Sequence, residues 1–479
     1  MRDVARVLSL TAALLVVGCG SDDQSFNYGN FFPGGSPGTV APTAVADSFS
    51  VLGGGILTGS VTANDTLNGS IVSTFQNPST SGGTVAITPG GQLTYTPPAG
   101  QANLSDTFTY TISNLGGSSK ATVTVTVGAR GFFVKNDVAV TGSGSQTSPF
   151  KTLLEATNAA TGTPGAQIVV FRGDGTSTGQ NVPVSLVANQ AIVAQDPANQ
   201  PTISGTITLA GNCTLANLRL IGNTGSNAVV GTGIIGATLA NVTVANTTGC
   251  GVNMTNPSGV VGMTGLTMAN IGLHALPLST NANGLNLTVS GLQVNNTTAN
   301  VSLAEITGAS VVNASFTDVI CTNVGTAFPF NIGFDWNARN TSNCTLRVSN
   351  YRMDSGGSGM FFASRDSSNT AVVLTNGNIT NCSDLAVFLS ALNSSSLKTR
   401  MTNSRLLNNL HGYRAEAGGT SALCARLLGN NSDRYDFSGF STLPLLVENL
   451  PGVSTENQGT TQTSGTDNNA TIDSCGIPQ

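Results

Sequence analysis

One pattern of apolar and polar positions recurs about every 26 residues between residues 215 and 408. The segments LANLRLIG (215–222), LANVTVAN (239–246) and MTGLTMAN (263–270) are three copies of it, at steps of 24 residues. Continued along the chain, the first position of the pattern is apolar in eight copies: Leu215, Leu239, Met263, Val289, Phe316, Val348, Leu374 and Met401. The sixth position is apolar in the same eight copies: Leu220, Val244, Met268, Val294, Cys321, Met353, Ile379 and Leu406. A repeat of this length predicts a stack of similar structural units, each packed on its neighbours.

The polar positions of the repeat predict where the chain bends. The third position is Asn, Gly or Asp in every copy, and these residue types tolerate a left-handed backbone. Side chains of a straight strand alternate between two faces, so positions one and four both point inward only if the chain turns between them. We therefore expect one corner at position three, a second at position eight, which is Asn in six copies, and a core built from positions one, four and six. Asn side chains at equivalent corners are expected to hydrogen-bond in a ladder that compensates their burial.

Shorter alternating segments precede the repeats. Between residues 42 and 127, segments such as GGTVAITPGGQLTYTPP and DTFTYTISN alternate along their length and are separated by Gly-rich turns, a pattern typical of a β-sandwich. Further on, Ser148 and Pro149 precede FKTLLEATNAA. This predicts a helix near residues 150–160, with Ser148 as its N-cap and Pro149 at its first position, which would cap one end of the stack.

Composition indicates a folded chain with little charge. Hydrophobic residues make up 39% of the chain and charged residues only 9%, which is enough apolar material for a core and unlike a disordered chain. The net charge of −5 offers no basic surface, so nucleic acid is not expected as a partner. The eight cysteines show no metal-binding spacing, so we expect no zinc site.

The first 41 residues predict export and anchoring. Arg2 and Arg6 precede a short apolar run that ends in VVGC at residues 16–19, which is too short to span a bilayer comfortably. The small residue before Cys19 resembles the lipobox of bacterial lipoproteins, although Val stands where Leu is commoner. That resemblance implies a signal peptide over residues 1–18, an acylated Cys19, a membrane partner and a location in the bacterial cell envelope, at the outer membrane or cell surface. The alternative is an ordinary secretory signal with an incidental Cys. Residues 19–41 are rich in Gly, Ser and Pro and predict a flexible tether.

Two further resemblances define the expected fold class as all-β. ANDT (63–66), LTYTPPAG (93–100) and SDTFTYTIS (105–113) resemble bacterial Ig-like and cadherin-like domains, which implies a β-sandwich spacer over residues 42–127. Some relatives bind calcium, but Asp47, Asp65 and Asp106 lack an accompanying acidic cluster, so no cofactor, including Ca²⁺, is expected. The repeats resemble right-handed parallel β-helix proteins of the pectate-lyase-like type, over residues 128–440, with a C-terminal cap or tail over 441–479. A leucine-rich repeat is the alternative, but its LxxLxLxxN spacing is absent.

The later repeats carry the candidate site residues. Ten of the chain's 18 basic residues lie between Asp335 and Asp436. In the repeat register, Arg352, Asn378 and Arg405 take the outward fifth position of consecutive coils, and Asp354 the outward seventh, so we expect this set to bind an anionic sugar. A solvated surface without a ligand is the alternative. His411, Arg414 and Glu416 form a weaker candidate catalytic group.

The fold alone does not select a function, because β-helices include polysaccharide lyases and hydrolases as well as non-catalytic adhesins. We expect no paired carboxylates on an outward face, and such a pair is the minimum for acid–base glycoside hydrolysis. The prediction is therefore a lipid-anchored envelope protein that binds a polysaccharide or another surface protein without catalysis. The alternative is a polysaccharide lyase or glycoside hydrolase on the same scaffold.

Overall fold

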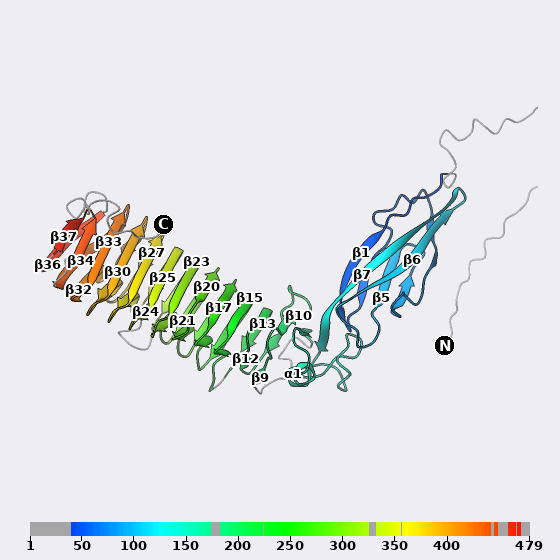
Figure 1. Cartoon of the computed structure of the whole chain (residues 1–479), viewed down its shortest axis with the longest axis horizontal. Helices are drawn as coiled ribbons and strands as arrows, with labels where there is room; N and C mark the ends of the chain where they lie inside the picture. Colours follow the sequence, from blue (N-terminus) through cyan, green and yellow to red (C-terminus); the bar gives the residue numbers. More distant parts are fainter. Residues whose placement is uncertain are drawn as a thin grey trace, which may run out of the picture.

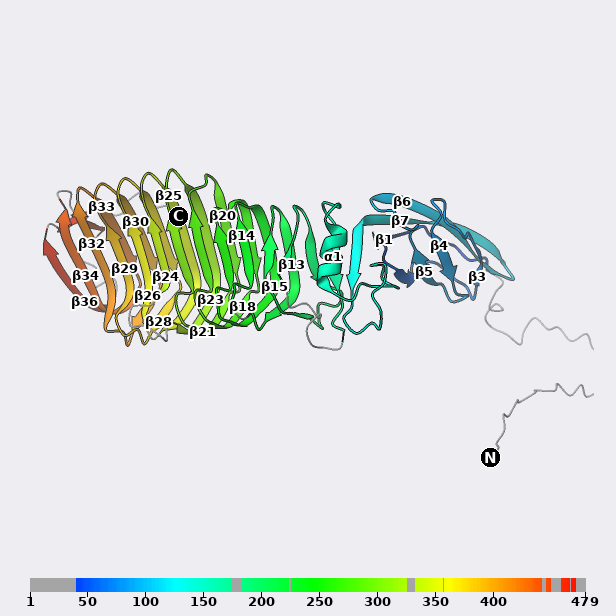
Figure 2. The same cartoon turned by 90° about the horizontal axis from the view of Figure 1, so that it is seen from below.

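The computed structural model describes residues 40–173, 183–223, 225–324, 332–355, 357–441, 445–448, 458–465 and 467–470. It is an elongated, nearly all-β molecule, with a small sandwich at one end and a β-solenoid of about 10 turns at the other (Figures 1 and 2). The predicted signal peptide, Cys19 and nearly all of the predicted tether lie outside the described residues. Within the described residues, no helix has both the length and the apolar character that a membrane crossing requires.

Two sheets form the sandwich. One contains β1 (Asp47–Gly53), β3 (Ile71–Phe75), β6 (Leu104–Asn114) and β7 (Gly117–Val134), and the other contains β2 (Leu57–Ser60), β4 (Thr84–Ile87) and β5 (Gln92–Thr96). Burial alternates along β5 and β6, as expected for strands with one face on the core. Tyr95, Phe108 and Tyr110 are fully buried between the sheets. This core is separate from that of the solenoid.

Strand β7 belongs to both parts of the molecule. Its first part pairs with β1 and β6 in the sandwich, and its last four residues, from Gly131 to Val134, pair with β8 (Gln167–Val170) of the solenoid. The predicted boundary at Val127 therefore falls inside a continuous strand rather than in a linker. The side chain of Gln146 adds a second connection, because its Oε1 accepts a hydrogen bond of 2.7 Å from the backbone N–H of Ile56 in the sandwich.

The one α-helix of the described residues, α1 (Leu153–Ala160), begins later than the sequence predicts. Its N-cap is Thr152, not Ser148: the Thr152 hydroxyl accepts from the backbone N–H of Glu155, and the Glu155 carboxylate accepts from the backbone N–H of Thr152. This reciprocal capping box satisfies two N–H groups that the helix itself leaves free. Leu153, Ala156 and Ala160 are fully buried, so the helix covers the first coil as predicted.

The solenoid has three faces of parallel strands. Face A contains β8, β10 (Ala191–Ala194), the first parts of β13 (Cys213–Ile221), β15 (Ile235–Thr247), β23 (Val311–Val324) and β25 (Asn343–Ser355), and β17 (Ser258–Thr264), β20 (Leu285–Ser290), β27 (Asn369–Thr375), β30 (Ser396–Thr402), β33 (Ala422–Leu428), β35 (Leu445–Glu448) and β37 (Asp467–Ala470). Face B contains β11 (Thr202–Ile203), the second parts of β13, β15, β23 and β25, and β18 (Thr267–Ile271), β21 (Gln293–Thr297), β28 (Asn378–Thr380), β31 (Arg405–Leu407) and the start of β34 (Asn431–Ser441).

Face C closes each coil. It contains β9 (Val184–Ser185), β12 (Ile207–Leu209), β14 (Val229–Thr232), β16 (Val252–Thr255), β19 (Leu276–Thr280), β22 (Ser302–Ile306), β24 (Ile332–Ala338), β26 (Ser358–Ser364), β29 (Leu385–Ala391), β32 (His411–Gly419), the rest of β34, and β36 (Gln458–Gly465). Strands β35, β36 and β37 continue the stack, so the solenoid extends past the predicted end at residue 440.

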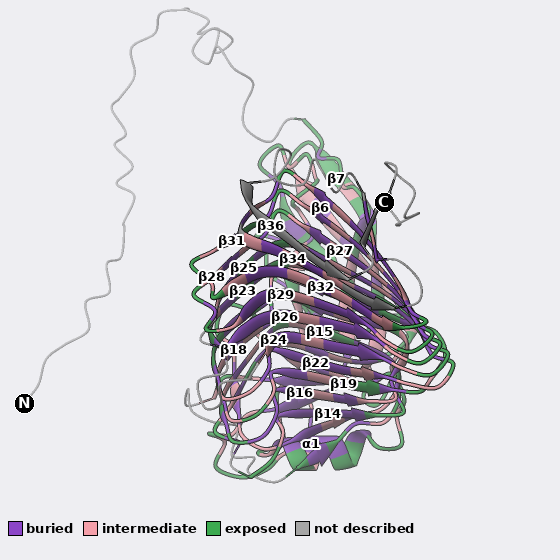
Figure 3. Ribbon diagram, turned by 90° about the vertical axis from the view of Figure 1, so that its left-hand side faces the viewer, coloured by how far each residue is buried: buried purple, intermediate pink, exposed green. Residues whose placement is uncertain are grey.

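The predicted register of the repeats is confirmed. Leu215 pairs with Leu239, Leu239 with Met263, and the same alignment continues through Met401 to Leu427. All sixteen predicted first- and sixth-position side chains are buried and contribute to one continuous core. Figure 3 shows buried and less buried residues alternating along the stacked strands. The core of each coil therefore packs on the equivalent residues of the next coil.

The predicted corners are also confirmed, but the reason given for the ladder is wrong. All eight third-position residues have φ between 51° and 66°, and Asn occurs with positive φ at position eight, as in Asn246 and Asn270. Asn270 Nδ2 donates to Asn246 Oδ1 at 2.8 Å, and Asn296 Nδ2 donates to Asn270 Oδ1 at 2.8 Å. These three side chains are exposed, not buried. Asn is therefore needed mainly for its tolerance of the left-handed backbone, and the ladder is an addition to that role.

Candidate functional site

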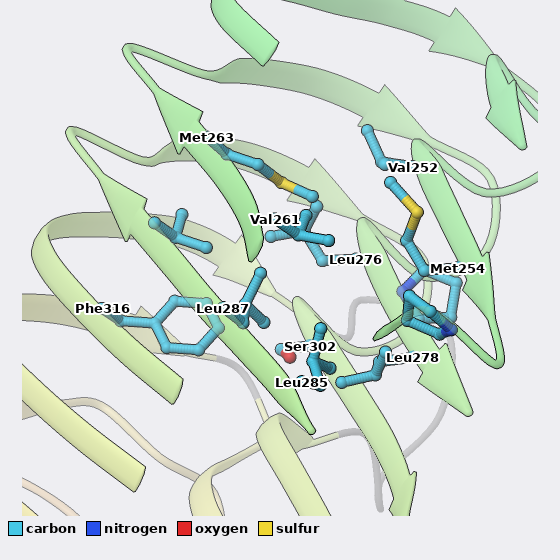
Figure 4. A pocket seen from close by; sticks show the side chains of 13 residues that line it. Val252, Met254, Val261, Met263, Leu276, Leu278, Leu285, Leu287, Ser302 and Phe316 are labelled. Atoms are coloured by element: carbon cyan, nitrogen blue, oxygen red, sulfur yellow. The ribbon is translucent and has the colours of Figure 1, made fainter. Parts of the chain in front are cut away.

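The interior of the solenoid has no room for a ligand at its best-formed hollow. This space lies between faces A and C in the early coils, and its volume of about 20 Å³ is close to what one water molecule needs. Apolar side chains converge on it, among them Met254, Met263, Leu287 and Phe316 (Figure 4). The Ser302 hydroxyl at its edge already accepts a hydrogen bond of 3.0 Å from Trp336 Nε1. Binding chemistry must therefore lie on the outer sides of the three faces.

On face B, the predicted binding residues lie in one outward column. Arg352 pairs with Asn378, and Asn378 with Arg405, so the two arginines are two coils apart, about 10 Å at the usual strand spacing. Both arginines are exposed, and neither forms an ion pair with a carboxylate of the described residues. Asp354 lies beside them but accepts a hydrogen bond of 2.9 Å from Asn381 Nδ2 at the corner.

The predicted catalytic group lies together on strand β32 of face C, but its members are engaged with other side chains. Arg414 lies 3.5 Å from the Glu416 carboxylate, which also accepts a hydrogen bond of 3.3 Å from Ser390. His411 Nδ1 lies 3.9 Å from an oxygen of Asp436, and Arg434 pairs with the same carboxylate. These contacts link neighbouring coils, and they describe a network of ion pairs rather than an acid and a base facing an open cleft.

Sequence analysis missed an aromatic pair in the same column of face C. Asp335, Phe361, Phe388, Arg414 and Asp436 are in register on consecutive coils. The rings of Phe361 and Phe388 are stacked with centroids 5.1 Å apart, and the Arg414 guanidinium lies 5.4 Å from the centre of the Phe388 ring. The signal was present in the sequence, because these residues recur at steps of 26, 27, 26 and 22 residues. Extending the alignment to the third strand of each coil would have found them.

The expectation that no two carboxylates share an outward face is wrong. Glu305 on β22 and Asp335 on β24 both point outward on face C, from adjacent strands. Burial, together with the nearby charge of Glu305, raises the pKa of Asp335 to about 6. Asn337 Nδ2 donates to Asp335 at 2.7 Å, and Glu305 lies 3.5 Å from the Arg339 guanidinium. The sequence could not show this, because the two carboxylates are 30 residues apart in a coil of unusual length.

The cysteines and potential metal ligands do not form a second site in the described ranges. Burial raises the pKa of the Cys321 and Cys344 thiols to about 12, so both are inert core residues. Cys424 is disulfide-bonded, and Cys475 lies outside the described residues. No three His, Cys, Asp or Glu side chains of the described residues gather as a metal site would require.

Comparisons with known proteins bear mainly on the sandwich. The family model of the bacterial Ig domain matches residues 39–126. No curated protein matches the chain. Two of the similar solved structures are catalytic domains of a GH87 alpha-1,3-glucanase in complex with nigerose. One is 10% identical, with 81% of this chain and 74% of that chain covered and a TM-score of 0.28, and the other is 12% identical, with 82% and 74% covered and a TM-score of 0.24. These likenesses are too weak to bear on activity. Residues 39–126 thus match the bacterial Ig domain family, and a β-solenoid of about 10 turns follows them.

Proposed function

We propose that the protein is a lipid-anchored bacterial envelope protein whose solenoid binds an acidic polysaccharide without cleaving it. Acylation at Cys19 would hold the chain at the outer membrane or cell surface, and residues 19–41 would tether it. The Ig-like domain then acts as a spacer. Its continuous strand β7 supports this role, because a shared strand transmits the orientation of one part to the other.

The observation that carries the binding proposal is the column formed by Arg352, Asn378 and Arg405. Two guanidinium groups on one outward column, without carboxylate partners among the described residues, suit repeated contact with an anionic chain. Such contacts hold a ground state and do not by themselves lower a reaction barrier. Binding of this kind requires no cofactor. Another surface protein with an acidic stripe would meet the same column.

Retention on immobilised polygalacturonate tests this proposal. The double variant Arg352→Ala/Arg405→Ala should elute earlier than the wild type, and the difference should shrink as salt is added. Arg219→Ala is the matched control, because Arg219 takes the same outward position of an early coil and pairs there with Thr243. Equal retention of the double variant and the wild type would refute the binding column. Turnover of a uronic-acid polymer that is abolished by Arg352→Ala would refute the non-catalytic assignment.

One observation favours the second candidate, a glycoside hydrolase on the same scaffold. A carboxyl group whose pKa is raised to about 6 beside a second carboxylate is suited to general acid catalysis, and Asp335 and Glu305 provide this combination on face C. Assays of reducing-end release on a panel of polysaccharides would reveal it. An activity that disappears in Asp335→Asn, while Arg352→Ala retains it, would establish the hydrolase and place it on face C.

A further inference from the structure

Face A carries a polar hollow on its outer side that no predicted site residue lines. Its volume is about 380 Å³, and its polar lining comes from four consecutive coils: Asn313, Asn343, Thr345, Asn369, Ser396 and Lys398. These side chains belong to face A, whereas the Arg352 column belongs to face B, beyond the corner at Asn350. The hollow is therefore a separate feature of the same coils.

The side chains of the hollow are arranged in two parallel columns. Asn343, Asn369 and Ser396 are in register in one column, and Asn313, Thr345, Ala371 and Lys398 are in register in the other. At the usual strand spacing, the three steps of the second column extend over roughly 14 Å. Asn369 Nδ2 donates to Asn343 Oδ1 at 3.1 Å, which fixes the orientation of both amides. The columns therefore present a fixed ladder of hydrogen-bonding groups along the solenoid axis.

Cations gather at the C-terminal end of this ladder. Lys398 ends the second column of the hollow, and Arg400, two residues further along the same strand, points to the same side. Neither forms an ion pair with a carboxylate of the described residues. Arg400 also pairs in register with Arg426 on the next strand, and like charges placed directly opposite each other are destabilising. An anion bound beside Lys398 and Arg400 would offset this repulsion.

The position after Lys398 limits the hollow. Cys424 follows Lys398 in the same outward column, and its side chain is disulfide-bonded and nearly buried. Ala371, between Thr345 and Lys398, is small and leaves space above the strand in the middle of the column. The hollow thus has an open middle, an amide-rich end and a cationic end.

We propose that this hollow binds an acidic sugar of the uronic acid type. Asn, Ser and Thr side chains both donate and accept hydrogen bonds, as the neighbouring hydroxyls of a sugar ring require, and Lys398 and Arg400 supply the charge that a ring carboxylate requires. A neutral sugar leaves the two cations uncompensated, and a simple anion leaves the amide ladder unused. The inference rests on the proposed function, since it assigns the class of sugar that the solenoid binds, but it places that sugar on face A.

Calorimetric titration with a short oligogalacturonate, and with its fully methyl-esterified form, tests the assignment. The wild type should bind the acid form more tightly than the ester. Lys398→Gln should weaken binding of the acid form about tenfold and change binding of the ester little. Asn343→Ala should weaken both forms, because the hydroxyl contacts are common to them. Lys120→Gln, in the sandwich, is the charge-matched control, and unchanged melting temperatures show that the variants are folded.

The variants also separate the inference from the proposed function. Loss of oligogalacturonate binding in Arg352→Ala/Arg405→Ala, with full binding in Lys398→Gln, overturns the face A site and leaves the proposed function standing. Absence of binding in the wild type overturns the inference, and it leaves the function to the retention experiment on the polymer. Binding of inorganic phosphate that depends on Lys398 but not on Asn343 would identify a simple anion site and overturn the sugar assignment.

Discussion

Tyr351 occupies the space that a side chain at residue 377 would need. A Cβ atom added to Gly377 would lie inside the Tyr351 ring, and the backbone of Gly377 itself does not require glycine, since its φ is not positive. The Tyr351 hydroxyl reaches one coil further and donates to Ser404 Oγ at 3.0 Å. These three residues hold the fourth position of consecutive coils. One large residue in the core is thus matched by two small ones, and the three side chains act as a single packing unit.

Gly377→Ala should destabilise the solenoid. The new methyl group overlaps the buried Tyr351 ring, and overpacking of this kind typically costs about 1–3 kcal/mol. Gly262→Ala is the matched control, because Gly262 lies in strand β17 with open space around it and has no positive φ. Urea unfolding should show a lower free energy of unfolding for Gly377→Ala and little change for the control. Equal stabilities would mean that Tyr351 does not fill this space.

Val294→Asp should destabilise the protein by several kcal/mol, because it places an unpaired charge in the core. Val294 is 2% exposed and packs between Met268 and Cys321 of the neighbouring coils. Thr267→Asp, at an outward position of the same face, should be nearly silent. The two melting temperatures provide the comparison, and similar losses in both variants would contradict the assigned faces.

Asn296→Ala should cost more stability than Asn296→Gly. The backbone at Asn296 has φ of 62°, which costs an alanine about 1 kcal/mol or more but costs glycine nothing. Both substitutions remove the hydrogen bond of 2.8 Å to Asn270. Chemical unfolding of the two variants therefore separates the two contributions. If alanine and glycine are equally harmful, the ladder rather than the backbone conformation makes Asn necessary here.

Asp335 should make the protein less stable as the pH rises. Because burial raises its pKa to about 6, compared with about 4 in the unfolded chain, the folded state binds the proton more tightly. The free energy of unfolding should therefore fall between about pH 4 and pH 6. Asp335→Asn cannot ionise, so its stability relative to the wild type should rise over that range. Asp47, whose pKa burial also raises to about 6, is present in both proteins and cancels in the comparison. A difference that stays constant with pH would contradict the raised pKa.

Cys19→Ala should remove the lipid anchor. If Cys19 is the acylated first residue of the mature protein, the variant should move from the detergent phase to the aqueous phase in a phase-partitioning assay. Cys250→Ala is the control, because Cys250 is a buried thiol in the solenoid, and this variant should stay in the detergent phase. Unchanged partitioning of Cys19→Ala would show that the chain is held at the membrane in another way or is simply secreted.

The sequence by itself determined the solenoid, its register and its corners. This was possible because each coil repeats the same local rules: an apolar residue such as Leu239 must pack on its equivalents, and a corner residue such as Asn241 must tolerate a left-handed backbone. Both rules act on residues that are close in sequence, and eight copies make them visible. The start of α1 was missed, because Ser148 and Thr152 are both possible N-caps and only the reciprocal bonds with Glu155 favour Thr152.

Tertiary structure decided which side chains meet on the outer surfaces. Asp335 and Glu305, and likewise Phe361 and Phe388, are brought together by stacking of face C, whose strands follow loops of unequal length. The polar hollow of face A arises in the same way, from Asn343, Asn369 and Lys398 on three successive coils. Outward positions carry no packing requirement, so no periodic rule links their identities along the chain. Their chemistry depends on lateral proximity between coils, which exists only once the solenoid has formed.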